Sequence, residues 1–300
     1  MNVLITGGTG LIGQALIEKL LCQNGSITVL TRNVTKAEQL FHRQVNLIDN
    51  LSKEAIENCD VVINLAGEAI ADKRWSTSQK QKICQSRWQL THQLTQLINQ
   101  ADSPPSLFIS GSAIGIYGRQ SEQTFDEKFT DFHEEFTHTV CHQWEEEALG
   151  ASSNKTRVAL LRTGIVLAKN GGAIGKMLLP FKLGLGGMIG NGKQVMSWIH
   201  IDDMVGAILH IKDNIEIEGP VNLTAPNAVS NQVFSRALSK QLNRPCLLTT
   251  PKWVLKVILG EMSELLVNGQ NVVPTKLVSS GFTFKHPNIE QAFSDLLSNT

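Results

Sequence analysis

The sequence predicts an α/β protein in which a parallel sheet is covered by helices on both faces. Short apolar runs of strand length alternate with segments whose apolar residues recur at helical spacing. A glycine-rich turn lies directly between the first such run and the first helical segment. With 300 residues, 42% of them hydrophobic and 18% charged, the chain can bury a large core. Two domains, or one domain with an appendage, are expected.

The predicted strands are the apolar runs at residues 3–5, 27–30, 61–65, 107–110 and 158–161. The first helix starts at Leu11, where apolar residues follow at helical spacing, and it ends at the turn 24–25. A long helix passes through residues 88–98, and another covers residues 134–149. This order of elements is typical of a doubly wound sheet.

The predicted domain boundary follows a change in composition near residue 170. Residues 1–170, together with residues near 195–215, are expected to form the sheet domain, and residues 171–300 the substrate-side loops and a smaller C-terminal α+β domain. The segment 171–194 is rich in glycine and is expected to form ordered loops around a site. From Pro220 on, short helices and proline-bounded strands predict a second domain that closes over the carboxyl edge of the sheet.

Charge and composition exclude several function classes. Lys plus Arg and Asp plus Glu are 27 each, and no block of like charges indicates a nucleic-acid arm or a basic stretch that faces a membrane. No apolar stretch reaches the roughly 20 residues that span a bilayer, and the chain does not open on a signal peptide. We therefore expect a cytoplasmic protein whose partner is a small molecule, not a nucleic acid or a membrane. The oligomeric state stays open.

The cysteines are odd in number and widely spaced, and no Cys-x-x-Cys pair occurs. This pattern favours free thiols in a reducing compartment over disulfides or a zinc site. The positions are Cys22, Cys59, Cys84, Cys141 and Cys246.

The turn after the first strand carries the most informative motif. Gly7, Gly10 and Gly13 form a G-x-x-G-x-x-G pattern between a strand and a helix. Bare backbone at these positions lets a pyrophosphate approach the helix N-terminus and its unpaired N–H groups. We therefore expect a Rossmann domain that binds a dinucleotide through Gly7, Thr9, Gly10, Leu11, Ile12 and Gly13.

The residues after the second strand indicate which dinucleotide is bound. Domains that bind NAD usually place a carboxylate there for the ribose hydroxyl. Here Thr31 and Arg32 follow Leu30, and the first carboxylate is Glu38. Because an arginine can pair with a 2′-phosphate, the sequence favours NADP over NAD. The alternative is that Arg32 is a solvated loop charge.

Several further segments resemble the extended short-chain dehydrogenase/reductase superfamily. They are the glycine turn, NLAG at 64–67, SGSAIGIYG at 110–118 and WIHIDD at 198–203. Longer phrases resemble the YfcH-like epimerase family, an atypical group with its own C-terminal domain: NLAGEAIADKRW, SRWQLT, LLRTGIVLAKNGGAIGKMLLPFKLGLGG and LGEMSELLVNGQNVVP. The resemblance covers the chain from Met1 to about Leu297.

The resemblance implies further cofactor contacts. Leu65, Ala66 and Gly67 would pass beneath the adenosine and pyrophosphate. Ser110 would lie near the nicotinamide ribose, and Val166 would pack beside the nicotinamide. Leu65 and Val166 would also suit a core. Arg87 stands where typical superfamily members have an active-site Asn, so its guanidinium would face phosphates or a substrate carboxylate; a surface-helix arginine is the alternative.

The superfamily's proton donor is a tyrosine followed four residues later by a lysine, which lowers the pKa of the phenol. The chain has one tyrosine, Tyr117, and the fourth residue after it is Ser121, so this pair cannot occur. Where the pair should fall, the sequence has Val140 with Trp144, or Cys141 with Glu145.

Three residues are candidate substitutes for the missing pair: Ser112, Tyr117 and Glu145. Ser112 resembles the substrate-orienting serine, although its spacing from Tyr117 leaves Ser110 as an alternative. Tyr117 belongs to a segment usually near the substrate, and Glu145 would act as acid or base if it were buried near the nicotinamide. His138 and His142 have the spacing of a metal pair, but without a third ligand we expect surface histidines and no metal site.

Two functions are therefore open. The first is an NADP-dependent oxidoreductase or epimerase that acts on a small, sugar-like or nucleotide-linked substrate and lacks the Tyr-x-x-x-Lys pair. The second is a non-catalytic NADP(H)-binding protein that senses the cofactor or serves in assembly. Lys176, Lys182 and Lys193 would suit a substrate phosphate or carboxylate, or would only keep their segment soluble.

Overall fold

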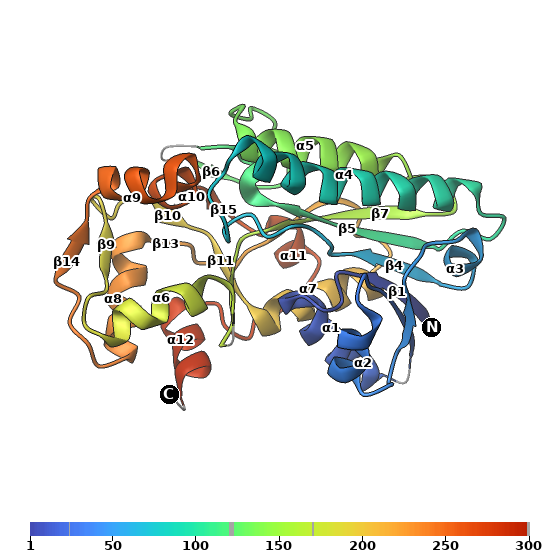
Figure 1. The fold of residues 1–300 in the computed structure, drawn as a ribbon, viewed down its shortest axis with the longest axis horizontal. Coiled ribbons are helices and arrows are strands. Elements are labelled where there is room, and N and C mark those ends of the chain that lie inside the picture. Colours follow the sequence, from blue (N-terminus) through green and yellow to red (C-terminus); the bar gives the residue numbers. More distant parts are fainter. Residues whose placement is uncertain (24, 120–122, 170, 299–300) are drawn as a thin grey trace.

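The computed structural model describes residues 1–23, 25–119, 123–169 and 171–298. At its centre lies a seven-stranded sheet in the order β12-β7-β5-β4-β1-β2-β3, in which every neighbouring pair is parallel (Figure 1). The five predicted strands are confirmed, and the sheet adds β3 and β12. The bounds are β1 (Asn2–Thr6), β2 (Ser26–Leu30), β3 (Asn46–Ile48), β4 (Val61–Asn64), β5 (Leu107–Ala113), β7 (Arg157–Thr163) and β12 (Gly219–Leu223).

Helices cover both faces of the sheet, which gives the Rossmann-like α/β architecture predicted from the sequence (Figure 1). Successive strand side chains point to opposite faces. Val3 and Ile5 therefore pack in one core, and Leu4 packs in the other. The first core is covered by α1 (Leu11–Leu21), α2 (Val34–Phe41) and α7 (Ile201–Asp213), and the second by α3 (Lys53–Glu57), α4 (Thr77–Gln100) and α5 (Phe136–Leu149).

The strand order reverses at β1, and this point is reinforced by buried hydrogen bonds. Thr6 and Asn64 are register partners at the carboxyl ends of β1 and β4. The Thr6 hydroxyl donates to Asn64 Oδ1 at 2.6 Å, and Asn64 Nδ2 donates to Thr91 Oγ1 of α4 at 2.8 Å. In open sheets of this kind, ligands bind in the crevice beyond such a reversal.

One segment expected in the second domain belongs to the main sheet. Residues 219–223 form β12, the edge strand of the main sheet beside β7, and not part of a second domain. Pro220 is tolerated there because an edge strand needs hydrogen-bond partners on one side only. The segment 171–194 is also not all loop, because α6 (Gly172–Lys182) buries Ile174 and Phe181 in the C-terminal core. That burial outweighs the low helix propensity of its glycines.

The remaining elements form the C-terminal part and its links to the sheet domain. A core around Trp198, Phe234 and Phe293 joins α6, α8 and α12. The strands pair in twos: β8 (Ile165–Leu167) with β11 (Trp198–His200), β9 (Gly187–Ile189) with β14 (Leu248–Thr250), β10 (Val195–Met196) with β13 (Val229–Ser230), and β6 (Thr124–Phe125) with β15 (Asn271–Val272). The helices are α8 (Asn231–Gln241), α9 (Lys252–Leu259), α10 (Glu264–Val267), α11 (Thr275–Ser279) and α12 (Ile289–Leu297), with the 3₁₀ turns η1 (Ile114–Tyr117) and η2 (Gly260–Ser263).

Within the described ranges, every helix is too short or too polar to cross a bilayer.

Candidate functional site

The glycine turn between β1 and α1 is packed so closely that side chains are excluded. Gly7 has φ +72°, and a Cβ there would lie 2.6 Å from the carbonyl carbon of Leu65. A Cβ on Gly13 would lie 2.4 Å from the Gly7 oxygen. Gly10 is the N-cap of α1 and provides no side-chain cap, so the first N–H groups of the helix are left for an anion. The turn therefore fits a pyrophosphate.

The other predicted residues of this region surround the turn. Thr9, Leu11 and Ile12 are half-buried in the turn and the first turn of α1. Leu65 and Ala66 are half-buried and Gly67 is exposed, directly after β4. A Cβ on Gly172, at the start of α6, would lie 3.3 Å from Leu11, so the C-terminal part reaches this turn.

Arg32 lies just beyond the end of β2 with its side chain exposed. Thr31 is buried, and its hydroxyl oxygen accepts the N–H of Asn33 at 3.2 Å. Asn33 in turn caps α2 by accepting the N–H of Lys36. Among the described residues, no hydrogen bond or ion pair holds Arg32, which leaves its five donors for a ligand.

Arg87 is half-buried on α4, beside the loop after β4. Its Nη1 donates to the carbonyls of Glu68 at 2.9 Å and Ile83 at 3.0 Å, and its guanidinium lies 5.0 Å from the ring centroid of Trp144. A Cβ on Gly67 would lie 2.8 Å from its Cζ. Burial lowers the pKa of Arg87 from its usual value. Because Arg87 is half-buried and donates to backbone carbonyls, it is not a solvated surface arginine. It packs against the predicted cofactor loop.

Glu145 is buried and hydrogen-bonded, not solvated. The Ser112 hydroxyl donates to its Oε1 at 2.6 Å, and Arg162 donates to Oε1 from Nε at 2.9 Å and to Oε2 from Nη2 at 2.8 Å. The side chains of Arg162 and Glu145 are only 5% and 9% exposed. Burial alone would lower the pKa of Arg162, but its hydrogen bonds and ion pair to Glu145 raise it overall.

Tyr117 lies in the interior and not at an open substrate surface. Its side chain is fully buried and stacks on Phe125 with ring centroids 5.3 Å apart. Its hydroxyl donates to Asn222 Oδ1 at 2.7 Å and accepts from Arg162 Nη1 at 3.1 Å. Burial raises the pKa of the phenol. These contacts argue against Tyr117 as the proton donor, because its hydroxyl is already engaged by Asn222 and Arg162 and the raised pKa makes the phenol a weaker acid.

Three further side chains of α5 bear on the predicted proton carriers and the predicted metal pair. Burial raises the pKa of Cys141 to about 12, so it remains a thiol. His138 is buried, against the expectation of a surface position, because it faces η1 and its Nδ1 lies 2.6 Å from the carbonyl oxygen of Ile116. His142 is exposed, with Nδ1 3.5 Å from Glu146.

The two residues expected beside the nicotinamide lie in different strands, β5 and β8. Ser110 is fully buried in β5, and its hydroxyl makes only a 3.4 Å contact with the carbonyl of Gly111. Val166 is half-buried in β8, where it is the register partner of Ile199. The lysines of the glycine-rich segment do not gather: Lys176 pairs with Asp72 at 2.6 Å, and Lys182 lies at the other end of α6.

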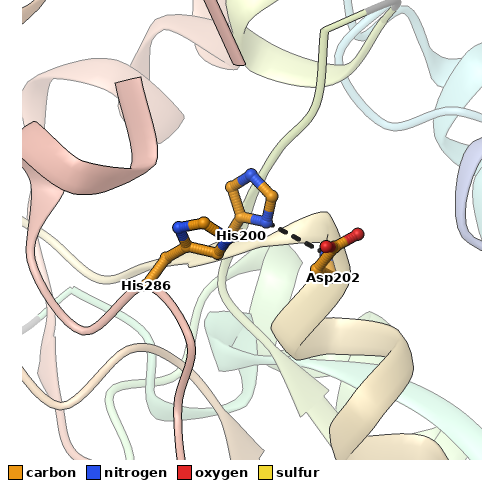
Figure 2. A group of neighbouring side chains, drawn as sticks. All are labelled: His200, Asp202 and His286. Atoms are coloured by element: carbon orange, nitrogen blue, oxygen red, sulfur yellow. Dashed lines mark hydrogen bonds between the residues drawn. The ribbon is translucent and has the colours of Figure 1, made fainter. Parts of the chain in front are cut away.

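His200, Asp202 and His286 bring metal-binding atoms within 4.8 Å of one another in the described part of the chain. Figure 2 shows the hydrogen bond from the Asp202 N–H to His200 Nδ1, at 3.1 Å, which already uses the lone pair of that nitrogen. The rings of His200 and His286 have centroids 3.9 Å apart, and their planes are tilted by 37°. Asp203 accepts the N–H groups of Lys285 and His286 at 2.7 and 2.9 Å. We assign these contacts to the joint between α7 and the C-terminal segment.

Sequence reasoning missed Arg162 and Asn222 as members of the buried network. The available signal was a charged residue within the otherwise apolar strand β7. A buried arginine requires a carboxylate partner, and Glu145 on the neighbouring helix was the candidate.

Comparison with known proteins decides the family. The model of the NAD dependent epimerase/dehydratase family matches residues 3–223. The chain belongs to this family. Residues 250–296 match a domain of unknown function, DUF1731, which corresponds to the C-terminal extra region of this family member.

Two relatives and one solved structure match this chain over almost its entire length. Epimerase family protein SH2119 of Staphylococcus haemolyticus is 39% identical, with 98% of each chain covered. Epimerase family protein YfhF of Bacillus subtilis is 37% identical, with 100% of this chain and 99% of the relative covered. The crystal structure of human epimerase family protein SDR39U1 with NADPH is 30% identical, covers 100% of both chains and has a TM-score of 0.89.

Proposed function

We propose that this family member is an NADP(H)-dependent oxidoreductase or epimerase acting on a small, sugar-like or nucleotide-linked substrate. The observation that carries the proposal is the glycine turn, whose side-chain-free backbone ends at an uncapped helix N-terminus. The NADPH in the human SDR39U1 structure supports the cofactor. A nucleoside-diphosphate sugar epimerase from Corynebacterium glutamicum, 28% identical with a TM-score of 0.80 over 99% of this chain and 58% of that one, supports the substrate class. We also place the chain in the YfcH-like group.

Residues on both sides of the turn would share cofactor binding. The N–H groups at the start of α1 would bind the pyrophosphate. Arg32 would bind the 2′-phosphate through charge-assisted hydrogen bonds. Arg87, beside Gly67, would face phosphates or a substrate carboxylate. When bound, the cofactor would supply a hydride as NADPH or accept one as NADP⁺.

Ser112 and Glu145 would transfer the proton of the substrate hydroxyl group. Glu145 accepts a hydrogen bond from Ser112, and Arg162 fixes the orientation of its carboxylate. In the direction of alcohol oxidation, Ser112 would take the proton of the substrate hydroxyl as it passes its own proton to Glu145. In the reverse direction, the same proton would return to the carbonyl oxygen.

A second candidate is an NADP(H) sensor or assembly protein without turnover. It is supported by the burial of Tyr117 and Cys141, which removes two titratable side chains from the possible proton carriers.

Calorimetric titration with NADPH and NADH tests the cofactor assignment. Arg32→Ala should weaken NADPH binding about ten- to hundredfold, because hydrogen bonds to charged groups contribute about 1.5–3 kcal/mol, and NADH binding should change little. Arg236→Ala, on the exposed side of α8, is the matched control. Equal losses for both cofactors would contradict the 2′-phosphate role, and no heat with either would refute cofactor binding.

Stopped-flow mixing of the NADPH-loaded protein with carbonyl compounds distinguishes the enzyme from the sensor. Loss of the nicotinamide absorbance supports turnover, which Ser112→Ala should slow while NADPH binding is retained. An unchanged absorbance across the panel would favour the sensor.

A further inference from the structure

The helix α9 presents an apolar surface to solvent. None of its eight residues is buried. Trp253, Val257 and Ile258 are 70%, 69% and 58% exposed. Trp253 and Val257 are four residues apart and therefore lie on the same side of the helix. Adjacent exposed groups of this size usually indicate an interaction surface.

The strand before α9 extends this surface. Leu247 is 87% exposed, and Leu248, the first residue of β14, is 49% exposed. β14 ends at Thr250 and α9 begins at Lys252, so the two elements are adjacent. Figure 1 shows both at the end of the molecule away from β1, β2 and β3. We call Leu247, Leu248, Trp253, Val257 and Ile258 the α9 patch.

The sequence that contains the α9 patch carries basic but no acidic residues, and the first acidic residue after it, Glu261, pairs with Lys80 of α4. The chain has no Asp or Glu from 219 to 260, although the whole protein carries equal numbers of acidic and basic residues. Lys252 and Lys256 lie on α9 itself and are exposed. The other cations of this stretch are Arg236, Lys240 and Arg244. The surface is therefore apolar and cationic together.

We propose that the α9 patch docks on an anionic phospholipid membrane, although the sequence alone predicted no membrane partner. The Trp253 ring with Val257 and Ile258 enters the boundary between headgroups and acyl chains. The stem of Lys252 packs against Gly190, and the ammonium groups of Lys252 and Lys256 reach lipid phosphates. A second copy of the chain fits less well, since a two-fold contact through α9 brings the lysines of both copies together.

The position of the patch links it to the predicted crevice. A Cβ on Gly190 would lie 2.8 Å from Lys252 Cε, so α9 rests on the glycine-rich segment. Gly260, directly after α9, lies beside Arg74 of the loop after β4. Docking therefore holds the segment around Gly190 and the loop after β4 close to the membrane, whatever reaction the protein carries out.

Co-sedimentation of the full chain with vesicles tests the proposal. We expect binding to phosphatidylcholine vesicles that contain about 30% phosphatidylglycerol at ~0.1 M salt, and little binding to phosphatidylcholine alone. The double variant Trp253→Ser with Val257→Ser should bind about tenfold less, and so should Lys252→Gln with Lys256→Gln. The lysine variant retains the apolar side chains and remains informative if the serine variant folds poorly.

Matched changes at other exposed positions serve as controls. Ile215→Ser, at a side chain 77% exposed after α7, and Lys82→Gln on α4 should leave vesicle binding unchanged. Absence of binding to the anionic vesicles, or binding that the α9 variants do not reduce, would overturn the proposal. A dimer in sedimentation equilibrium that Trp253→Ser dissociates, without vesicle binding, would assign the patch to a second copy.

Discussion

Two polar regions lie at the carboxyl ends of the sheet strands, and they differ in what satisfies their hydrogen-bonding groups. After β1, the N-terminus of α1 has no side-chain cap, and Arg32 beyond β2 is exposed. Around β5 and β7, the side chains of Ser112, Glu145 and Arg162 bind one another. The hydrogen-bonding groups of the first region are left for an external ligand, whereas those of the second region bind one another. The contrast explains why cofactor binding follows more directly from the structure than catalysis does.

The buried network should carry the largest stability effect. Glu145→Ala leaves the guanidinium of Arg162 buried without its carboxylate, so the free energy of unfolding should fall by about 3–5 kcal/mol. Urea denaturation measures this change. Glu146→Ala, at the neighbouring exposed carboxylate, should change it by less than about 0.5 kcal/mol. Equal stability of Glu145→Ala and the wild type would mean that the network does not stabilise the fold.

A substitution in the glycine turn should instead change the affinity for NADPH. Gly13→Ala places a methyl group 2.4 Å from the Gly7 oxygen, and the displaced backbone should bind NADPH at least about tenfold more weakly. Gly175→Ala is the control, because a Cβ there meets nothing within 4 Å and alanine favours the helix. Calorimetry of both variants checks the expectation, which fails if the two bind NADPH alike.

A third and smaller effect, on the pH dependence of stability, is expected at His200, where α7 contacts the C-terminal segment. Burial, and then His286, lowers the pKa of His200, although Asp202, Asp203 and Asp295 act in the opposite direction. The unfolded chain therefore binds a proton more readily than the folded one. Stability should be fully present above about pH 6.5 and decrease as the pH falls below it, by at most about 1.4 kcal/mol for each unit of pKa lowering.

Thermal unfolding between pH 5 and 8 measures this dependence. His200→Gln should flatten the profile, whereas His42→Asn, at an exposed position with φ 48° that asparagine tolerates, should not. A slope that persists in His200→Gln would assign the effect to other groups.

Sequence patterns identified the elements that depend on local or periodic signals. The strands around Val3, Val62 and Phe108 and the helices α1, α4 and α5 follow from apolar periodicity. The helix α6 and the edge strand β12 did not follow, because burial of Ile174 and Phe181 and pairing with β7 are interactions with distant parts of the chain. The network was missed for the same reason: Tyr117 and Asn222 are 105 residues apart.

By itself, the sequence determined that a glycine turn joins a strand to a helix, that an arginine replaces the usual carboxylate after β2, and that no Tyr-x-x-x-Lys pair exists. These are properties of neighbouring residues, and backbone sterics and charge fix their meaning locally. Only the tertiary structure decided that Glu145 is buried against Arg162, that Tyr117 is enclosed, and that Trp253 faces solvent. Burial depends on which distant segments pack together, and the spacing of residues along the chain does not encode it.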